Sequence, residues 1–535
     1  MKISIDWNDL LIEEGKLDPL GLWRVGDRLN GELLKPFTTI VLHRPARYFS
    51  MYCWIIQFLQ ENKIVDKNKY WERFYELESL LLCAIQLHHN HNYENFKGQI
   101  GSESAKTMIA AAINNTIRAE KINNGWDVNY KTPMFDFALY EVDFGSPGNL
   151  KLTEAGTKLA EAYKNSIEAT SFYREYLSKR EVPVNVIREL SESSCPCLLF
   201  TPSTDFLLQE REAIINSMLR VVEGNTEDKN KLLLSIYLIL DCMISLDESG
   251  IPFNKIIWHR ILSNQVYLTG AQFKNYDFPK RFEEIFKEWQ LYNLDLLFVY
   301  SLENGLSGFL QYLQGLTTDL KFNELEPAAR EMFKKGQLDC AQDNLIKMIP
   351  LAGNITSAYD YFNLQSSNLL YEFEARLVDK IQSASSGLRL FYSFLLYVYL
   401  QSKMNSKLKK ADYKSSLEFY REGSERDGRE LSLLNTLNDV SPVLNEKIEK
   451  GFTKIFLKKW IVDRQLETRI TRGKDIAWFS RISETQTYSF EENYSTSLYR
   501  ASRIDILLSF LLNIEIVREG DDSWVPNRSS SFFKA

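Results

Sequence analysis

The sequence predicts a mainly α-helical, multi-domain protein with one or two winged-helix-like modules. Three observations support this fold class. Apolar residues recur at helical spacing in many stretches, hairpin patterns lie beside helices near Leu150 and Gly520, and no fixed-period repeat is present. Of the 535 residues, 44% are hydrophobic and 25% are charged, which is the balance of a globular chain with a sizeable core. A chain of this length is expected to form two to four domains.

Long stretches with apolar residues three or four positions apart predict the helices. The expected helices are Tyr48–Gln60, Lys67–His88, Ser102–Ala119, Phe206–Val222, Lys229–Leu246, Phe278–Leu313, Glu324–Met348 and Ala358–Ala384. The most apolar stretch, Leu388–Leu400, is too short to span a bilayer and is expected to be a buried helix.

Two hairpin patterns suggest winged-helix-like modules. Met134–Phe144 is expected to form a strand, a Gly-Ser-Pro-Gly turn follows, and a second strand begins at Leu150. Thr153 is expected to cap the next helix, with Gly156 allowing close approach inside it. Such hairpins also occur in other settings, so a winged helix is one of two interpretations.

The second pattern lies in the last part of the chain, where an amphipathic helix over 500–514 precedes a hairpin over 516–525. Composition shifts then give the expected domain limits. They are an N-terminal helical domain with a winged-helix-like element (1–180), a Pro-rich connector (181–205), a central helical domain (206–401), a polar hinge or loop (402–430) and a basic, winged-helix-like C-terminal domain (431–535).

Charge and cysteine content limit the function classes. The net charge of −7 argues against a chain coated in basic residues for nucleic acid, although a local basic patch remains compatible with it. The six cysteines form no Cys-x-x-Cys pair, which is typical of a reducing compartment. Met1–Leu11 lacks the apolar core of a signal peptide. We therefore expect a cytoplasmic protein with no membrane association.

The chain contains no complete match to the common catalytic motifs. Gly473–Lys474 lacks the leading glycine of a phosphate-binding loop and is followed by Asp475. Gly305–Gly308 is one residue short of a hydrolase nucleophile elbow. No His-Glu-x-x-His motif or dinucleotide fingerprint is present. We predict no catalytic residue, no cofactor and no resident metal.

Two polar clusters nevertheless contain residue types that bind metals. His88, His89 and His91 could bind a metal with Glu94, but histidines are also favoured at the C-terminal end of a helix by its dipole. Cys195 and Cys197 flank Pro196, a spacing too tight for an ordinary zinc knuckle.

A pair of carboxylates, Glu141 and Asp143, alternates on an expected strand. Metal-dependent nucleases hold magnesium with such pairs, but the lysine that they also need is replaced here by Gly145. A solvated strand face is the favoured interpretation of the pair.

The clearest charge anomaly is the basic segment Lys454–Arg481, which carries a net charge of +5 over 28 residues. Its basic residues are Lys454, Lys458, Lys459, Arg464, Arg469, Arg472, Lys474 and Arg481. Cationic side chains could neutralise phosphates, and the interleaved Trp460, Trp478 and Phe479 could stack on bases. Alternatively, the segment is a solvated face whose aromatic side chains enter the core.

A smaller basic group near the N-terminus contains Arg24, Arg28 and Arg47. Arg24 and Arg28 are one helical turn apart and could clamp one anion. Pairing of these arginines with Asp27 and Glu32 is the favoured structural alternative. The candidate nucleic-acid-binding residues of the sequence are this group and the basic segment.

Three blocks of the chain resemble large helical proteins of unknown function encoded in prokaryotic antiviral defence islands. They read LGLWRVGDRLNGELLKPFTT with RPARYFSMYCWIIQFL, WQLYNLDLLFVYSLENGL, and RASRIDILLSFLLNIEIV. The matching positions in the first block are Leu20, Gly21, Asp27, Arg28, Leu29, Arg47, Tyr48, Phe49, Ser50, Tyr52 and Trp54. Pro45 departs from the pattern, which has a basic residue there. The resemblance carries over no functional residue.

The resemblance implies a multi-gene antiviral system in which another gene supplies an ATPase or nuclease. We therefore expect a non-enzymatic subunit that binds double-stranded DNA or partner proteins and couples recognition to that effector. A divergent metal-dependent nuclease is the first alternative. A winged-helix transcriptional regulator is the second, and the length and acidity of the chain disfavour it.

Overall fold

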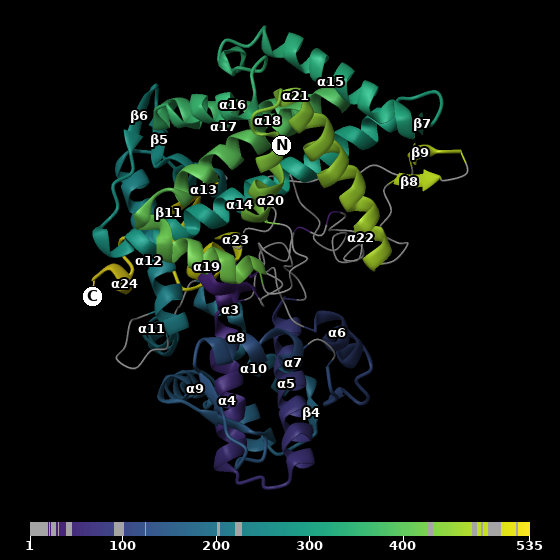
Figure 1. Cartoon of the computed structure of the whole chain (residues 1–535). Helices are drawn as coiled ribbons and strands as arrows, with labels where there is room; N and C mark the ends of the chain where they lie inside the picture. The colour runs from purple at the N-terminus through teal and green to yellow at the C-terminus, as the bar shows by residue number, and fades with distance from the viewer. Residues whose placement is uncertain are drawn as a thin grey trace. The chain divides into compact units, whose positions relative to one another are not determined.

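The chain is mainly helical and carries only short sheets of two or three strands (Figure 1). The computed structural model describes residues 20, 22, 28–29, 31–38, 45–89, 101–122, 125–200, 204–219, 227–425, 432–472, 479–482, 485–490, 504–520 and 523–534. Two compact units form, and each combines distant parts of the chain. Unit 1 contains Met1–Asn30 and Ile256–Ser502, and unit 2 contains Gly31–Lys255 and Arg503–Ala535. These limits differ from those expected from composition, because residues 503–535 pack with residues 31–255.

Unit 2 is built on α4 and α5, which are neighbours in space (Figure 1). Its helices are α3 (Lys35–Thr38), α4 (Arg47–Glu61), α5 (Lys67–His89), α6 (Ser102–Ala110), α7 (Trp126–Asn129), α8 (Lys131–Asp136), α9 (Glu154–Ile167), η3 (Phe172–Tyr176), α10 (Val184–Ser194), η4 (Pro196–Leu199), α11 (Asp205–Met218), α12 (Glu227–Glu248), α23 (Ile504–Asn513) and α24 (Ser531–Lys534). Its strands are β1 (Thr116–Arg118), β2 (Tyr140–Val142), β3 (Leu150–Leu152), β4 (Glu181–Pro183), β10 (Val517–Gly520) and β11 (Ser523–Pro526).

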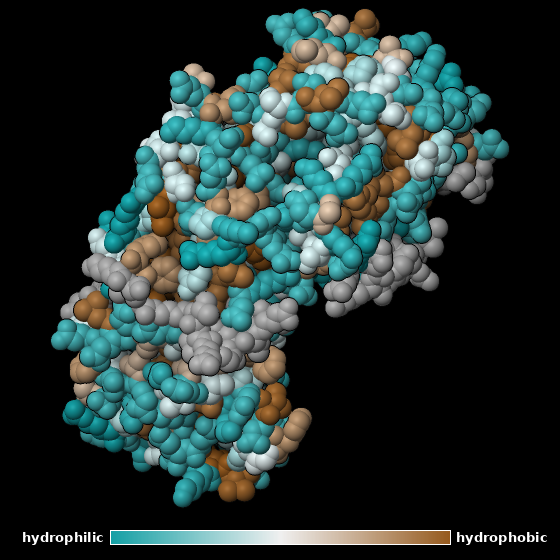
Figure 2. Space-filling view, turned by 60° about the vertical axis from the view of Figure 1, so that its left-hand side comes forward, coloured by the Kyte–Doolittle hydropathy of each residue, from teal (hydrophilic) through white to brown (hydrophobic). Residues whose placement is uncertain are grey.

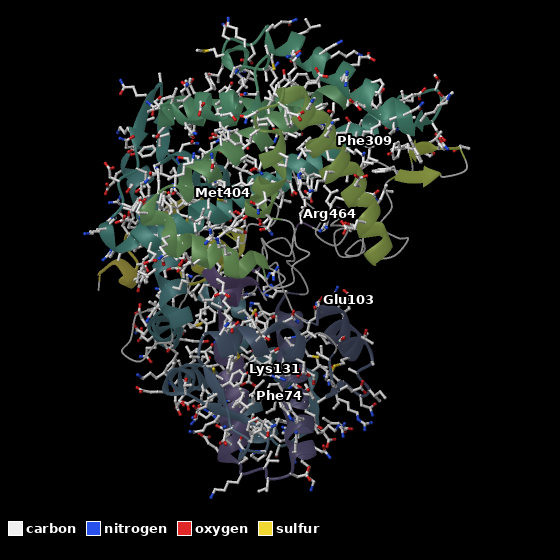
Figure 3. The ribbon with its side chains drawn as sticks, in the orientation of Figure 1. Phe74, Glu103, Lys131, Phe309, Met404 and Arg464 are labelled. Carbon is white, nitrogen blue, oxygen red and sulfur yellow. The ribbon has the colours of Figure 1, made fainter. Side chains whose placement is uncertain are left out.

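Aromatic side chains fill the interior of unit 2. Tyr52 of α4 lies 5.2 Å from Trp126 and 5.1 Å from Tyr130, measured between ring centroids. Phe74 of α5, labelled in Figure 3, lies 5.4 Å from Trp126. The helical spacing seen over residues 48–60 and 67–88 therefore marks faces that pack on each other, and both helices are confirmed.

The first hairpin pattern is confirmed, together with its cap. Strands β2 and β3 pair antiparallel, and the Thr153 side chain accepts a hydrogen bond from the backbone nitrogen of Gly156 (3.2 Å) at the start of α9. A Cβ on Gly156 would lie 2.0 Å from the carbonyl oxygen of Leu139, so this glycine does permit close approach. The expected strand over 134–144 is only partly right, because α8 occupies residues 131–136.

The second hairpin is also confirmed, in strands β10 and β11 after α23. Trp524 of β11 exchanges two backbone hydrogen bonds with Phe253, of 2.8 and 3.3 Å. This contact fastens the hairpin to residues of the same unit far earlier in the chain. Both hairpins thus exist, while a winged-helix module at either place stays a prediction.

Unit 1 surrounds two long helices, α14 and α18, that pack along each other. Its helices are α13 (Lys255–Asn264), η5 (Lys280–Phe282), α14 (Glu283–Gln314), η6 (Phe322–Glu324), α15 (Leu325–Cys340), η7 (Ile346–Met348), α16 (Ile355–Asn363), α17 (Ser367–Ser383), α18 (Ser386–Leu408), η8 (Ala411–Tyr413), α19 (Lys414–Glu425), α20 (Leu433–Val440), η9 (Ser441–Val443), α21 (Ile448–Lys450), η10 (Gly451–Asp463) and α22 (Arg464–Arg472). Its strands are β5 (Val266–Thr269), β6 (Gln272–Asn275), β7 (Leu320–Lys321), β8 (Phe479–Ile482) and β9 (Thr487–Phe490).

The apolar stretch over 388–400 forms the middle of α18, where every residue from Leu390 to Leu400 is buried. Its environment confirms the expected buried helix. The described residues include no helix that is both long and apolar enough to cross a membrane. On the face seen in Figure 2, hydrophilic side chains predominate and hydrophobic ones occur in smaller areas between them.

Three stretches have a secondary structure that differs from the one expected from the sequence. The supposed hinge over 402–430 continues α18 to Leu408 and then forms α19, while residues 426–430 lie outside the described residues. The supposed connector over 181–205 forms β4, α10 and η4, and α10 packs on α5. The helix expected over 102–119 ends at Ala110 because the chain then turns into β1. In the first two stretches packing partners elsewhere in the chain outweigh local polarity.

Candidate nucleic-acid interface and histidine-cysteine cluster

The basic segment begins on η10, a π-helix whose two sides differ. Its apolar side enters the core of unit 1, where Phe452 lies 5.6 Å from Phe333 and Phe456 lies 5.6 Å from Phe394 between ring centroids. Its other side carries Lys454, Lys458 and Lys459, which are all exposed. π-Helical segments are rare in proteins, and those that occur often lie at functional sites. This element is therefore a candidate for a functional surface.

A groove of about 650 Å³ runs beside η10 and the start of α22. It is lined by Leu325, Glu326, Thr453, Lys454, Lys458, Lys459, Trp460, Asp463, Arg464 and Glu467. The structure thus gathers four of the predicted cationic residues at one surface. Three carboxylates share the groove, so its charge is mixed rather than uniformly positive.

The four cations differ in how far the protein already uses them. Lys459 forms an ion pair with Asp439, and its ammonium lies 4.8 Å from the centroid of the Trp460 ring. Arg464, labelled in Figure 3, donates to the carbonyl oxygen of Leu20 (2.9 Å) and pairs with Glu467 (3.1 Å). Lys454 and Lys458 are exposed, and neither lies within 4.0 Å of a carboxylate oxygen of another described residue. Both still act at longer range on Glu326 of the same groove, whose pKa is lowered first by Arg330 and then by these two lysines. These two lysines are therefore the cations best placed to meet an external anion.

The aromatic residues of the segment do not support base stacking. Trp460 is 7% exposed and Phe479 is fully buried, so the faces of their rings are inside the protein. This part of the sequence interpretation was wrong, and the alternative of aromatic side chains entering the core holds for these two residues. Trp478 lies outside the described residues.

The other candidate cations are scattered. Arg469 and Arg472 belong to α22 and Arg481 belongs to β8, where only the backbone is described. Lys474 and Arg24 lie outside the described residues, and Arg28 is half-buried in unit 1. Among the predicted basic clusters, side-chain geometry is therefore described only for the cations of the groove.

Arg47 occupies a different setting, inside unit 2. Its side chain has no exposure and forms an ion pair with Glu210 of α11 (3.0 Å). Its Nη1 donates to the carbonyl oxygen of Cys195 (2.8 Å), and its Nη2 donates to Ser166 (2.7 Å). The structure thus corrects the expectation of a nucleic-acid contact at Arg47, because the whole guanidinium is engaged by the protein.

The two sequence clusters with metal-binding residue types come together in unit 2. His88 and His89 end α5, while Cys195 precedes η4 and Cys197 lies within it. Ligand atoms of His88, Cys195 and Cys197 all lie within 4.8 Å of one another. The Nε2 atom of His89 is 2.9 Å from Sγ of Cys195, and the two sulfur atoms are 3.2 Å apart. His91 lies outside the described residues.

Burial and neighbouring groups perturb the thiols of this cluster in opposite directions. Hydrogen bonding from Cys195, together with the two imidazoles, lowers the pKa of Cys197. Burial raises the pKa of Cys195. Hydrogen bonding with Cys197 raises the pKa of His88. The first proton therefore leaves the half-buried Cys197, whose thiolate the neighbouring donors stabilise.

The strand carboxylates are engaged locally. Glu141 pairs with Lys151 across the hairpin (2.7 Å), and Asp143 accepts a hydrogen bond from the backbone nitrogen of Gly145 (2.9 Å). Among the described residues, neither belongs to a group of three possible metal ligands. The solvated strand face favoured from the sequence accounts for Glu141, which is 57% exposed on its side chain.

Comparison with protein-family models, with curated proteins and with solved structures finds no match to this chain. A functional proposal for this protein therefore rests on the geometry of the groove and of the histidine-cysteine cluster.

Proposed function

We propose that this protein is a non-enzymatic subunit of a multi-protein antiviral complex and that the groove beside η10 contacts the backbone of double-stranded DNA. The observation that carries the DNA-binding part is the exposed pair Lys454 and Lys458 on one wall of the groove. Two ammonium groups that no described carboxylate pairs with can neutralise phosphates at little cost in lost internal contacts.

The groove chemistry favours double-stranded over single-stranded nucleic acid. Proteins that bind single strands stack successive bases on exposed aromatic rings. The rings available here, Trp460 and Phe479, are buried. Lysine side chains contact phosphates and carry no information on the bases. The expected binding therefore depends on salt concentration and little on base sequence.

The carboxylates of the groove restrict where a phosphate can lie. Glu326, Asp463 and Glu467 would repel phosphates from the positions next to them. Arg464 and Lys459 have acidic partners within the protein and add less to the attraction. The duplex backbone is therefore expected to run along the exposed lysines rather than to fill the groove.

Fluorescence anisotropy with a labelled duplex over a range of salt concentrations tests the proposal. Two phosphate contacts contribute a slope of about −1.8 to the plot of log affinity against log salt. We expect the Lys454→Ala/Lys458→Ala variant to bind the duplex about tenfold more weakly than the parent. Its plot of log affinity against log salt should be shallower by about 1.8. The matched control is Lys409→Ala/Lys410→Ala, which removes the same charge from exposed positions at the end of α18. Equal binding by the groove variant and the parent would exclude the groove.

The role in antiviral defence is supported by the resemblance of residues 20–59, 289–306 and 500–517 to proteins of defence islands. It implies that the effector ATPase or nuclease is a separate chain. The test expresses this gene with its chromosomal neighbours in a phage-sensitive bacterium. We expect phage protection that is lost when this gene is deleted and reduced in the lysine-pair variant. Full protection without this gene would contradict the proposed role.

A further inference from the structure

We propose that His88, Cys195 and Cys197, with His89 as the fourth ligand, form a structural zinc site in unit 2. This inference is independent of DNA binding, because it concerns a different unit and different residues. It rests on the meeting of two short sequence clusters that are 106 residues apart in the chain.

The distances within the cluster are those of a ligand set that can close on one ion. Zinc binds thiolates at about 2.3 Å and imidazole nitrogens at about 2.0–2.1 Å, so tetrahedral ligand atoms lie about 3.3–3.8 Å apart. The two sulfur atoms are 3.2 Å apart, and Cys195 Sγ is 2.9 Å from His89 Nε2. The ligand atoms of His88, Cys195 and Cys197 lie within 4.8 Å of one another. Side-chain shifts below about 1 Å bring the three within bonding distance of one ion.

The chemistry of the ligands selects the metal. Two thiols and two imidazoles are soft or borderline donors, which bind zinc well and bind magnesium or calcium poorly. Magnesium and calcium prefer oxygen ligands, and none of the three grouped residues is a carboxylate; Glu192, 3.9 Å from Nδ1 of His88, is 73% exposed on its side chain. A set of four protein ligands leaves no open coordination position, which is the arrangement of structural rather than catalytic zinc.

The surroundings hold the ligands in place from outside the cluster. Arg47 donates to the carbonyl oxygen of Cys195, so the backbone of one ligand is tied to α4 and α11 through the ion pair with Glu210. Glu192 of α10 lies 3.9 Å from Nδ1 of His88, beyond hydrogen-bond distance, and a rotation of its exposed side chain would let it accept from this atom. A carboxylate behind a histidine ligand commonly fixes its ring orientation in zinc sites.

Charge balance favours the ion at this partly buried position. Zinc binding replaces two S–H bonds by two Zn–S bonds, and both protons pass to water. Two thiolates and one Zn²⁺ sum to zero, so the occupied site adds no net charge to the interior. The ion would then join the end of α5 to the segment between α10 and α11, two parts that the chain otherwise connects only through long intervening stretches.

The experiment uses the full chain, reduced and freed of metal, and titrates it with zinc against a chromophoric chelator. We expect about one zinc per chain to be retained against the chelator. Cobalt added to the same protein is expected to give intense tetrahedral visible bands and a sulfur-to-cobalt charge-transfer band in the near ultraviolet. These two measurements need no variant, so a folding defect cannot obscure them.

Variants then assign the ligands. Cys197→Ala and His88→Ala are expected to weaken zinc binding by at least tenfold. Cys83→Ala is the matched control, because it removes a buried thiol of the same helix outside the cluster and should leave one zinc bound. His89→Ala tests the fourth position, and loss of one nitrogen donor should alter the cobalt bands.

Two results would overturn the proposal. One is a parent protein that binds no zinc in competition with the chelator and gives no charge-transfer band with cobalt. The other is a native protein whose mass spectrum shows a Cys195–Cys197 disulfide that zinc does not prevent, which would assign the pair to thiol oxidation instead. Zinc retained in full by both Cys197→Ala and His88→Ala would equally exclude this cluster.

Discussion

Arg47 of α4 and Glu210 of α11 form an ion pair in which neither side chain has any exposure. The guanidinium meets the carboxylate through Nε as well, at 3.1 and 3.0 Å from its two oxygens. Ser50 donates to the same carboxylate. This network joins α4 and α11 through two residues that are 163 positions apart in the chain.

Removing one partner of this pair should destabilise unit 2 strongly. Glu210→Gln leaves a buried guanidinium without its counter-charge, at an expected cost of about 3–5 kcal/mol. The double variant Arg47→Met/Glu210→Leu, which leaves no charge behind, should lose less. Hydrogen exchange of α4 amides under native conditions measures both. The interpretation of a buried compensated pair fails if the single variant is as stable as the parent.

The buried carboxyl of Glu78 should make the stability of unit 2 depend on pH. Its carboxyl accepts hydrogen bonds from Tyr52 and from the backbone nitrogen of Trp126, and burial raises its pKa from 4.5 to about 7. Between those values the folded state binds more protons than the unfolded state, so stability falls as pH rises and levels off above about 7. The full loss is roughly 3 kcal/mol.

Glu78→Gln should remove this pH dependence, because the amide keeps the accepting oxygen and never ionises. The free energy of unfolding of the parent and of the variant is measured with urea at about pH 5 and at about pH 8. We expect similar stability at the lower pH and a more stable variant at the higher pH. An unchanged slope in the variant would mean that another group titrates in this range.

Gly156 tests the close approach at the start of α9. A Cβ there would lie 2.0 Å from a backbone oxygen, which cannot move without displacing the hairpin. Gly156→Ala should therefore cost about 1–3 kcal/mol. Gly145→Ala in the turn of the same hairpin is the control, since its Cβ would meet only the Asp143 side chain at 3.2 Å. Thermal unfolding of both variants gives the comparison, and equal losses would contradict the steric argument.

Tyr420 and Asp295 explain why the expected polar hinge is a packed helix. The hydroxyl of Tyr420 on α19 donates to the buried Asp295 carboxylate of α14 (2.5 Å), whose pKa burial raises to about 6. Tyr420→Phe should cost about 1–3 kcal/mol at pH 8 and less at about pH 5, where the carboxyl is protonated.

Hydrogen exchange in α19 measures this effect. Tyr361→Phe is the control, because the Tyr361 hydroxyl makes no hydrogen bond with another described residue. Exchange in α19 that is as slow in Tyr420→Phe as in the parent would show that apolar packing alone holds the helix.

Local patterns predicted the elements better than the sites. Helical spacing located α4, α5 and the middle of α18, and turn and cap residues located both hairpins. These features depend on neighbours within a few residues. The histidine-cysteine cluster could not be predicted as one site, because His88 and Cys195 meet only after α5 and α10 pack together.

The same reasoning explains the errors in charge. Arg47 reads as one of several basic residues in the sequence, and its partner Glu210 is too distant in the chain for local pairing rules to find. Trp460 looked available for stacking because its neighbours are lysines, yet the π-helix turns its ring toward the core. The exposure of Lys454, Lys458 and Lys459 agrees with both interpretations of the basic segment, since charges without a local partner are usually solvated, and their contact with nucleic acid stays a prediction.

The return of residues 504–534 to unit 2 has a consequence for how this protein is made. A ribosome synthesises about 250 residues of unit 1 after α12 before it reaches β11, the strand whose Trp524 pairs with Phe253. During that interval the apolar surface of α12 that β11 later covers is exposed to solvent. Nascent chains stalled within unit 1 should therefore be the ones that recruit chaperones, and unit 2 should be the last part to become resistant to protease.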